Sequence, residues 1–375
     1  MVDRIINRIM FLLKDEVRKL GLTSYKDVGI NRRVVEKYHK AIGPLIASTH
    51  SNSAGVVVLP IIGHYAGLIE ISNGIFALHS DGVGTKVIIA QLMKRYDTIG
   101  IDCIAMNAND VICVGARPIA FIDYIALKSS NNTLVKEILK GLVKGARYSD
   151  VTIVGGETAI LPDIISGVDE THAFDLAGTV LGVLETGNRP ILGNSIQTND
   201  VILGVESSGL HSNGYTLARK ILLSRYSLKD QPSYMSKSLG EELLVPTRIY
   251  VKPVLEILKS RSSITVHGLA HITGGSFTKL LRLNKRRKYS LTNLPPQFGI
   301  FKQIAVDGPV GLKEMYRTFN MGIGFCVIAP RESIYSISKI FRRHRTSCVE
   351  IGNVEGTGKG EVSAILNGKR YLLAR

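Results

Sequence analysis

Short apolar segments that alternate with segments of helical length constrain the fold of this chain more than any other feature of the sequence. Runs rich in β-branched and aromatic residues predict strands, and they lie at residues 75–79, 120–126, 151–154, 176–184, 201–205 and 321–328. Helices are predicted at 96–115, 132–149, 215–224, 251–259 and 333–343, and strands at 349–354 and 361–366 are predicted to form a closing hairpin. Because many of the strands lie too close together for obligatory crossover helices, the pattern favours an α+β fold over a doubly wound sheet.

The length of the chain, 375 residues, predicts two lobes, because a single hydrophobic core stops growing at about 250–300 residues. We expect a helical extension at 1–22, a first lobe at 23–186 and a second lobe at 187–375. A hydrophobic content of 45% with 37 glycines and 12 prolines is typical of a folded globular protein rather than a disordered or fibrous one.

The cysteines indicate a reducing compartment. Cys103, Cys113, Cys326 and Cys348 are sparse and show no C-x-x-C spacing, so we expect reduced thiols in a cytoplasmic protein, with neither a disulfide framework nor a zinc site. Asn7 and Arg8 interrupt the only segment that could imitate a signal peptide. No apolar run reaches the roughly 18–20 residues of a membrane span, so no membrane partner is expected.

The formal net charge of +16 raises the possibility of nucleic-acid binding through the basic clusters at 285–288 and 342–345. These clusters contain no interleaved aromatic residues and match no recognition motif. We therefore expect no nucleic-acid partner. A generally basic surface would instead raise the local concentration of phosphorylated small molecules.

The most informative motif follows the first of these strands, at residues 81–86. Asp81 can hold a hard cation, Gly82 and Gly84 let backbone N–H groups approach oxygen anions, and Lys86 can neutralise phosphate charge. A strand-ending turn with solvated charges would use the same residues. From the residues alone both interpretations stay open.

A second polar group lies on the apolar helix that follows. Asp102, Asn109 and Asp110 share one face of this helix at 100° per residue. The two carboxylates are about 12 Å apart along the axis, too far for one metal ion but within the span of a metal-nucleotide. A solvated stripe is the alternative, although the apolar neighbours leave little room for one.

Two loops carry further polar groups. Residues 155–158 read Gly-Gly-Glu-Thr after a strand, and residues 209–215 offer His211, Ser212 and Asn213 before a helix, where phosphate can meet the positive helix end. An ordinary helix N-cap by Ser212 or Asn213 is equally compatible with the second loop.

Three other patterns are set aside. His267 and His271 lack the Glu of H-E-x-x-H, so no zinc site is expected there. Residues 356–360 imitate a Walker A loop, but Gly360 replaces the required Ser or Thr. A dinucleotide G-x-G-x-x-G is absent because Val87 stands where the third glycine is needed.

In their order and their amino-acid sequences, these motifs resemble those of the aminoimidazole ribonucleotide (AIR) synthetase family, the phosphoribosylformylglycinamidine cyclo-ligases. The resemblance covers about residues 24–355. It is carried by residues 24–29, 81–86, 97–102, 109–110, 155–158, 211–215, 246–252, 270–275 and 315–322.

The resemblance implies a homodimer in which the mixed sheet of the first lobe joins the same sheet of the partner subunit. It also implies that the first lobe binds ATP and Mg²⁺ and that the second lobe is an α/β lobe. The implied reaction closes the imidazole ring of formylglycinamidine ribonucleotide. ATP would activate the formyl-amide oxygen, and the substrate's own amine would then displace phosphate.

The resemblance also implies roles for individual residues. The implied metal ligands are Asp81 and Asp110, and the implied ATP or phosphate contacts are Lys26, Asp27, Gly82, Gly84, Thr85, Lys86 and Asn109. The implied substrate contacts are Gly156, Glu157, Thr158, Asp175, His211, Ser212, Asn213, Gly274 and Gly275. Asp102, His211 and Glu157 are the implied catalytic residues.

Some segments depart from the family pattern. The family's glycine-rich segment before the Asp81 strand is represented only by Gly55 and by residues 62–67. Ile160-Leu161-Pro162 stands where Glu-Met-Pro is usual, and Ser276 replaces a third glycine. These changes affect the predicted nucleotide and substrate loops.

Related enzymes and a different class of protein are the alternatives. A thiamine-monophosphate kinase would lack the sequence motifs found here at 246–252 and 315–322. A selenophosphate synthetase would carry a reactive cysteine before Cys103, which is the first cysteine of this chain. An RNA-binding scaffold that lost catalysis would account for the charge, and salt-dependent RNA retention would distinguish it.

Overall fold

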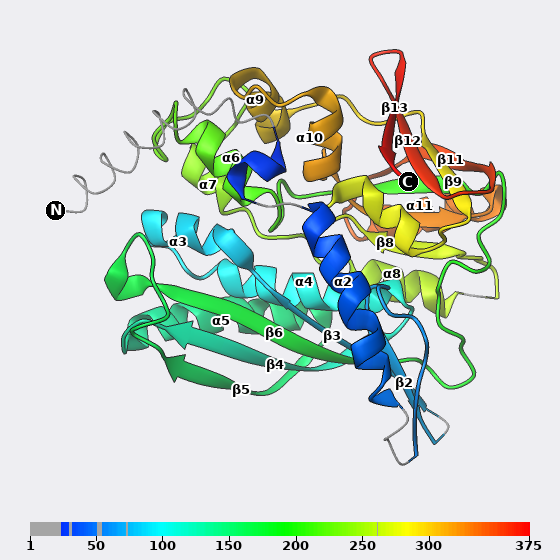
Figure 1. Cartoon of the computed structure of the whole chain (residues 1–375), viewed down its shortest axis with the longest axis horizontal. Coiled ribbons are helices and arrows are strands. Elements are labelled where there is room, and N and C mark those ends of the chain that lie inside the picture. Colours follow the sequence, from blue (N-terminus) through cyan, green and yellow to red (C-terminus); the bar gives the residue numbers. More distant parts are fainter. Residues whose placement is uncertain (1–23, 30–31, 51–54, 73, 261) are drawn as a thin grey trace.

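Two β-sheets organise the chain in the computed structural model, which describes residues 24–29, 32–50, 55–72, 74–260 and 262–375 (Figure 1). In these ranges the first sheet has six strands, in the order β1-β2-β3-β6-β4-β5, and the second has seven, in the order β13-β12-β9-β11-β7-β10-β8. The predicted boundary at 186/187 falls between the last strand of the first sheet and the first strand of the second. The predicted extension at 1–22 lies outside the described residues.

The first sheet is mixed. Its strands are β1 (Val56–Val58), β2 (Gly67–Ile71), β3 (Gly74–Gly82), β4 (Arg117–Leu127), β5 (Thr152–Ile160) and β6 (Phe174–Val183). All neighbours are antiparallel except β4 and β5, which are parallel and are joined through a helix. The associated helical segments are η1 (Tyr25–Val28), α2 (Arg32–Ala47), η3 (Gly84–Lys86), α3 (Val87–Met93), α4 (Ile99–Cys113), α5 (Asn132–Ser149) and η4 (Glu170–His172).

The second sheet is antiparallel except where β12 pairs with β9. Its strands are β7 (Val201–Glu206), β8 (Gly268–His271), β9 (Arg287–Leu291), β10 (Ile323–Ala329), β11 (Cys348–Thr357), β12 (Glu361–Leu366) and β13 (Lys369–Ala374). Its helical segments are α6 (Tyr215–Leu222), α7 (Leu239–Leu243), α8 (Val251–Lys259), η5 (Ser276–Arg282), α9 (Gly299–Asp307), α10 (Leu312–Thr318) and α11 (Arg331–Arg343).

Helix α4 is the centre of the molecule. Every one of its residues is buried, as expected for a helix that is apolar nearly all round. It packs on β3, β6 and α5 of the first lobe and also contacts β8 and α8 of the second lobe (Figure 1). The polar residues of α4 therefore lie where the two lobes meet.

Most predicted elements are confirmed, and the helices at 132–149 and 251–259 have the predicted bounds. The predicted closing hairpin is wrong, because β9 lies between β11 and β12, and β12 forms its hairpin with β13. Residues 155–158 were expected in a loop but belong to β5, where Gly155–Ile160 pair in parallel with β4 after a register shift. Both differences come from pairing between distant segments.

No helix among the described residues is long and apolar enough to cross a membrane.

Candidate active site

The polar face predicted on α4 points at the second lobe. Asp102 and Asn109 are completely buried and Asp110 is 4% exposed. A solvated stripe is thereby excluded. Buried polar groups require partners, and each of the three side chains finds its partners in a different way.

Asp102 accepts hydrogen bonds from both lobes. The Lys86 ammonium lies 2.9 and 2.8 Å from its two oxygens. From the second lobe, the backbone N–H of Thr247 (2.7 Å), its hydroxyl (2.6 Å) and the Ser212 hydroxyl (3.1 Å) reach Oδ1. The carboxylate thus ties the first turn of α4 to the loop that carries the predicted substrate residue Ser212.

Lys86, which was expected near the phosphates, is held by groups of both lobes. Its side chain is fully buried, and besides Asp102 it donates to the backbone carbonyls of Val245 (2.6 Å) and His211 (3.3 Å). Burial lowers the pKa of Lys86, and the Asp102 charge opposes this effect. In this structure Lys86 neutralises a buried carboxylate, and the three acceptors of its ammonium group are all protein groups.

Asn109, which was also expected to contact ATP, bonds to the second lobe in this structure. Its amide nitrogen donates to the Arg248 carbonyl (2.8 Å), and its amide oxygen accepts from the Tyr250 N–H (2.9 Å). Both ends of the amide are therefore used to hold the backbone before α8 against α4.

Asp110 lies beside two histidines, His79 and His271, to which the sequence analysis assigned no role. His271 Nδ1 is 2.7 Å from Oδ1, and His79 Nε2 is 3.6 Å from Oδ2. Burial alone would raise the pKa of Asp110, but the His271 hydrogen bond and the nearby positive charges lower it. Asp110 is accordingly ionised.

Asp81 lies close to Asp110. Burial and the negative charge of Asp110 raise the pKa of Asp81, and the nearby His79 and Lys279 oppose this shift only in part, as expected when two carboxylates lie close together. Asn107, another residue missed from the sequence, fixes the backbone of Asp81 by accepting from its N–H (3.0 Å) and donating to its carbonyl (3.1 Å).

The Asp81–Asp110 pair fits a divalent cation. Mg²⁺ is commonly held by one or two carboxylates together with substrate phosphates and water, and a cation would relieve the repulsion that raises the pKa of Asp81. Within the described ranges no three His, Cys, Asp or Glu side chains are arranged to hold a metal by themselves. The pair therefore suits a metal that arrives with a phosphorylated ligand.

His211 holds its own loop together. It adopts a left-handed backbone conformation (φ +64°), and its Nε2 accepts from the Ser208 N–H at 3.1 Å. Burial, reinforced by the charges of His271, Lys86 and Arg248, lowers the pKa of His211. The ring is 1% exposed, and its bond to the Ser208 N–H holds the loop in this conformation.

The remaining second-lobe residues lie together. The Asn213 amide donates to Met106 Sδ of α4 at 3.9 Å. A Cβ on Gly274 would lie 2.9 Å from Asn213 Oδ1, so the Gly274 backbone and the Asn213 side chain lie close together. Gly275 (φ +97°) precedes η5, and Ser276 (φ +51°) donates to the Phe319 carbonyl at 2.6 Å. The family glycine replaced by Ser276 thus stood at a left-handed position that glycine prefers.

One row of residues crosses the face of the first sheet that α4 covers. Register aligns Asp81, Gly178, Asp123 and Gly156, and a Cβ on Gly178 would lie 3.2 Å from the Cys103 sulfur of α4. Asp123 was not singled out from the sequence, although a carboxylate inside an apolar strand is itself a signal. A Cβ on Gly156 would lie 2.4 Å from Asp123 Oδ1, so this glycine makes room for the carboxylate.

Glu157 and Asp175 lie elsewhere. Glu157 follows Gly156 and aligns with the exposed Tyr124, while Asp175 precedes the buried Leu176. Both carboxylates are exposed on the face of the sheet that points away from α4. The structure therefore does not bring the predicted catalytic Glu157 together with Asp102 and His211.

The remaining predicted residues lie on separate elements. Gly84 and Thr85 are exposed, and the Thr85 hydroxyl lies 3.2 Å from that of Thr216 in α6. Lys26 and Asp27 are exposed in η1, which contacts α6. Gly82 and Thr158 belong to β3 and β5.

Comparison with known proteins agrees with this architecture. The family descriptions "AIR synthase related protein, N-terminal domain" and "AIR synthase related protein, C-terminal domain" match residues 63–184 and 197–365. A phosphoribosylformylglycinamidine cyclo-ligase of Methanocaldococcus jannaschii is 44% identical over 335 residues, which is 89% of this chain and 92% of that protein. Its namesake from Pyrococcus furiosus is 45% identical and covers 89% and 95% of the two chains.

Solved structures share the fold at low sequence identity. The thiamine-monophosphate kinase of Stenotrophomonas maltophilia K279a has a TM-score of 0.59 at 17% identity, covering 86% of this chain and 95% of that one. The hydrogenase maturation protein HypE in complex with ATP also has a TM-score of 0.59 at 17% identity, covering 84% and 90%. With both family descriptions and these relatives matched, the chain belongs to the AIR synthase family, as a relative of the phosphoribosylformylglycinamidine cyclo-ligases.

Proposed function

We propose that this protein is an ATP-dependent phosphoribosylformylglycinamidine cyclo-ligase, which closes the imidazole ring of formylglycinamidine ribonucleotide in purine biosynthesis. The observation that carries the proposal is the combination of 44–45% identity to named cyclo-ligases with the pairing of the part-buried Asp81 and the buried Asp110. The reaction transfers the γ-phosphoryl group of ATP to the formyl-amide oxygen and releases ADP. The substrate's amine then attacks the carbon that bears this oxygen. Phosphate leaves with the oxygen, and a proton is lost.

Asp81 and Asp110 would hold Mg²⁺, which supplies positive charge to the transferring phosphoryl group. His271 and His79 keep Asp110 ionised, and Asn107 keeps Asp81 in register with it. These three residues act by positioning the carboxylates. Gly82, Gly84 and Thr85 follow Asp81 directly, which supports a place for them beside the phosphates.

Lys86 and Asp102 are proposed as the pair that sets the distance between the lobes. Among the groups that they bind, Ser212 is a predicted substrate residue, and Val245 and Thr247 belong to the segment before α8. Effective intramolecular reactions depend on this kind of alignment.

We further propose a homodimer that forms over the exposed face of the first sheet. Leu78, Ile122 and Tyr124 are exposed apolar side chains on that face, and Val154 and Ile160 are exposed on its edge strand β5. An apolar sheet face of this kind favours association. Glu157 and Asp175 share the face, so a partner subunit would enclose them.

The buried free thiols of Cys103, Cys113 and Cys326 support a reducing, cytoplasmic setting.

The test is to incubate the purified protein with formylglycinamidine ribonucleotide, ATP and Mg²⁺ and to follow the aminoimidazole product. Asp81→Asn and Asp110→Asn are each expected to lower kcat by at least about a hundredfold, because the transferring phosphoryl group loses charge stabilisation. Glu332→Gln, an exposed change on α11, is the control. A folded, ATP-binding wild-type protein that forms no product would overturn the proposal.

A further inference from the structure

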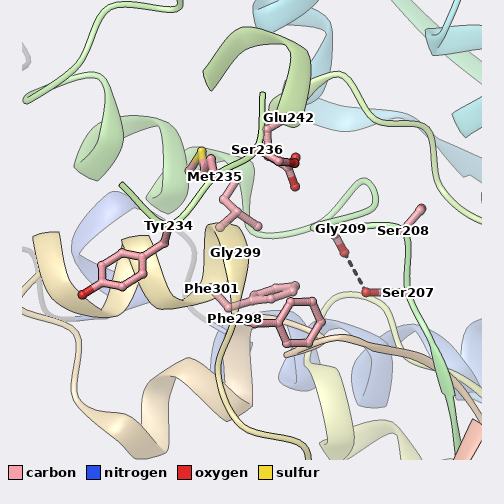
Figure 2. Close-up of a pocket in the computed structure, with 11 residues that line it drawn as sticks. Ser207, Ser208, Gly209, Tyr234, Met235, Ser236, Glu242, Phe298, Gly299 and Phe301 are labelled. Atoms are coloured by element: carbon pink, nitrogen blue, oxygen red, sulfur yellow. Dashed lines mark hydrogen bonds between the residues drawn. The ribbon is translucent and has the colours of Figure 1, made fainter. Parts of the chain in front are cut away.

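A pocket in the second lobe contains none of the residues assigned above. Its volume is about 350 Å³, and it lies between the segment 207–209, the segment 234–236, helix α7 and the start of helix α9. Figure 2 shows the carboxylate of Glu242 on one side of this pocket and the rings of Phe298 and Phe301 on the other. A volume of this size is at the small end of the range for small-molecule sites.

The Glu242 carboxylate is a hydrogen-bond acceptor that has no donor among the described residues. A Cβ on Gly209 would lie 3.7 Å from Glu242 Oε1, so the carboxylate borders the pocket wall. Among the described residues its carboxylate has no hydrogen bond or ion pair, and burial raises the pKa of Glu242 against the opposing charge of Lys237. A half-buried carboxylate in this state favours a ligand that donates hydrogen bonds.

Helix α9 supplies donors. Gly299, Ile300 and Phe301 line the pocket and form the first turn of this nine-residue helix. The N–H groups of a first turn have no partner within the helix, and no side chain caps this end. The ligand should therefore also present an acceptor to the α9 end of the pocket.

Neighbouring residues hold the rings of Phe298 and Phe301 in place. The rings of Phe298 and Phe301 meet edge to face, with centroids 6.2 Å apart. The Phe298 ring lies so close to Gly322 that a Cβ there would be 2.9 Å from it. Gln303 of α9 accepts from the Tyr234 N–H at 3.2 Å and so ties the helix to the opposite wall. Phe301 is buried, so the exposed ring of Phe298 is the aromatic surface that a planar ligand would meet.

The other polar groups narrow the choice of ligand. The Ser207 hydroxyl donates to the Gly209 carbonyl at 3.0 Å and the Ser208 hydroxyl donates to the Pro246 carbonyl at 2.6 Å, so both are already used. A phosphate at this wall would meet the Glu242 carboxylate at close range. A purely apolar ligand would leave that carboxylate desolvated and unpaired.

We propose that this pocket binds a guanine base. Guanine presents two adjacent donors, N1–H and the N2 amino group, which match the two oxygens of the Glu242 carboxylate. Its O6 acceptor is beside these donors and suits an N–H of the first turn of α9. One ring face stacks on Phe298, which is 55% exposed, as in other sites that recognise an exposed base by its edge and its faces. Adenine carries the opposite pattern next to its amino group, and inosine lacks the N2 donor.

The experiment is equilibrium dialysis of the full-length protein with labelled guanosine, in the presence of a saturating non-hydrolysable ATP analogue that occupies the nucleotide site. Guanosine is expected to bind, and adenosine and inosine to bind at least about tenfold more weakly, which corresponds to the loss of one paired edge contact. Glu242→Gln is expected to weaken guanosine binding by a similar factor, and Phe298→Leu to weaken all three nucleosides together.

The matched control is Glu241→Gln, which changes the neighbouring residue of α7. Glutamine can keep the capping box that Glu241 forms with Ser238, so guanosine binding should be unchanged. Thermal melting verifies that each variant is folded. Equal binding of adenosine and guanosine, full binding by Glu242→Gln, or displacement of guanosine by formylglycinamidine ribonucleotide would each overturn the proposal. The last outcome would assign the pocket to the substrate site.

Discussion

At the scale of single residues, the pairing of Lys86 with Asp102 has the largest consequence for stability. Both side chains are completely buried, and their interactions extend into both lobes. Taking two charges out of water costs free energy that the pair recovers only while both partners and their hydrogen bonds remain.

Asp102→Asn is therefore expected to lower the free energy of unfolding by about 3–5 kcal/mol, because it leaves the Lys86 ammonium buried without a counter-charge. Urea denaturation followed by circular dichroism measures this change. Glu350→Gln, which breaks the exposed Arg331–Glu350 pair, should cost no more than about 1 kcal/mol. Similar losses in the two variants would contradict the importance given to the buried pair.

At the scale of elements, α4 and α5 touch through their backbones. A Cβ on Gly100 would lie 2.2 Å from the backbone nitrogen of Leu142, and one on Gly141 would lie 2.6 Å from the Asp97 carbonyl oxygen. Neither neighbour can rotate away as a side chain would. The two glycines thus allow α4 to sit deep enough between sheet, helix and second lobe to present its polar face.

Gly100→Ala tests this crossing. In an isolated helix the change would stabilise by up to about 1 kcal/mol, but here the added methyl group must push α5 away, and we expect a loss of about 3 kcal/mol in unfolding free energy. Gly356→Ala, where a Cβ meets nothing within 4 Å, should have little effect. A Gly100→Ala protein as stable as the wild type in the same denaturation experiment would show that the helices can separate freely.

At the scale of the whole molecule, the exposed face of the first sheet determines the proposed assembly. Ile122→Glu places a charge at the centre of that apolar face, next to Tyr124, and is expected to convert a dimer into a monomer. Sedimentation velocity measures the change. Tyr335→Glu, a replacement at an exposed site on α11 in the second lobe, should leave the dimer intact. A wild-type protein that sediments as a monomer at the concentration of the activity assay would exclude the assembly.

The sequence by itself determined the local elements and the positions of several polar groups. The bounds of α5 follow from its amphipathic spacing and from Asn131, whose side chain accepts from the Leu134 N–H at the helix start. Asp102, Asn109 and Asp110 were expected on one helix face, and they share one. These features depend on contacts between residues a few positions apart, which periodicity and capping rules describe directly.

Only the tertiary structure decided what those groups touch. Asp102 meets Thr247 across 145 positions of sequence and Asp110 meets His271 across 161. The same is true of β9, which separates the two strands expected to form a hairpin. Periodicity says which side of an element is buried but not which distant segment covers it. That choice depends on packing the whole chain at once, and it brought Lys86 against Asp102 as its counter-charge.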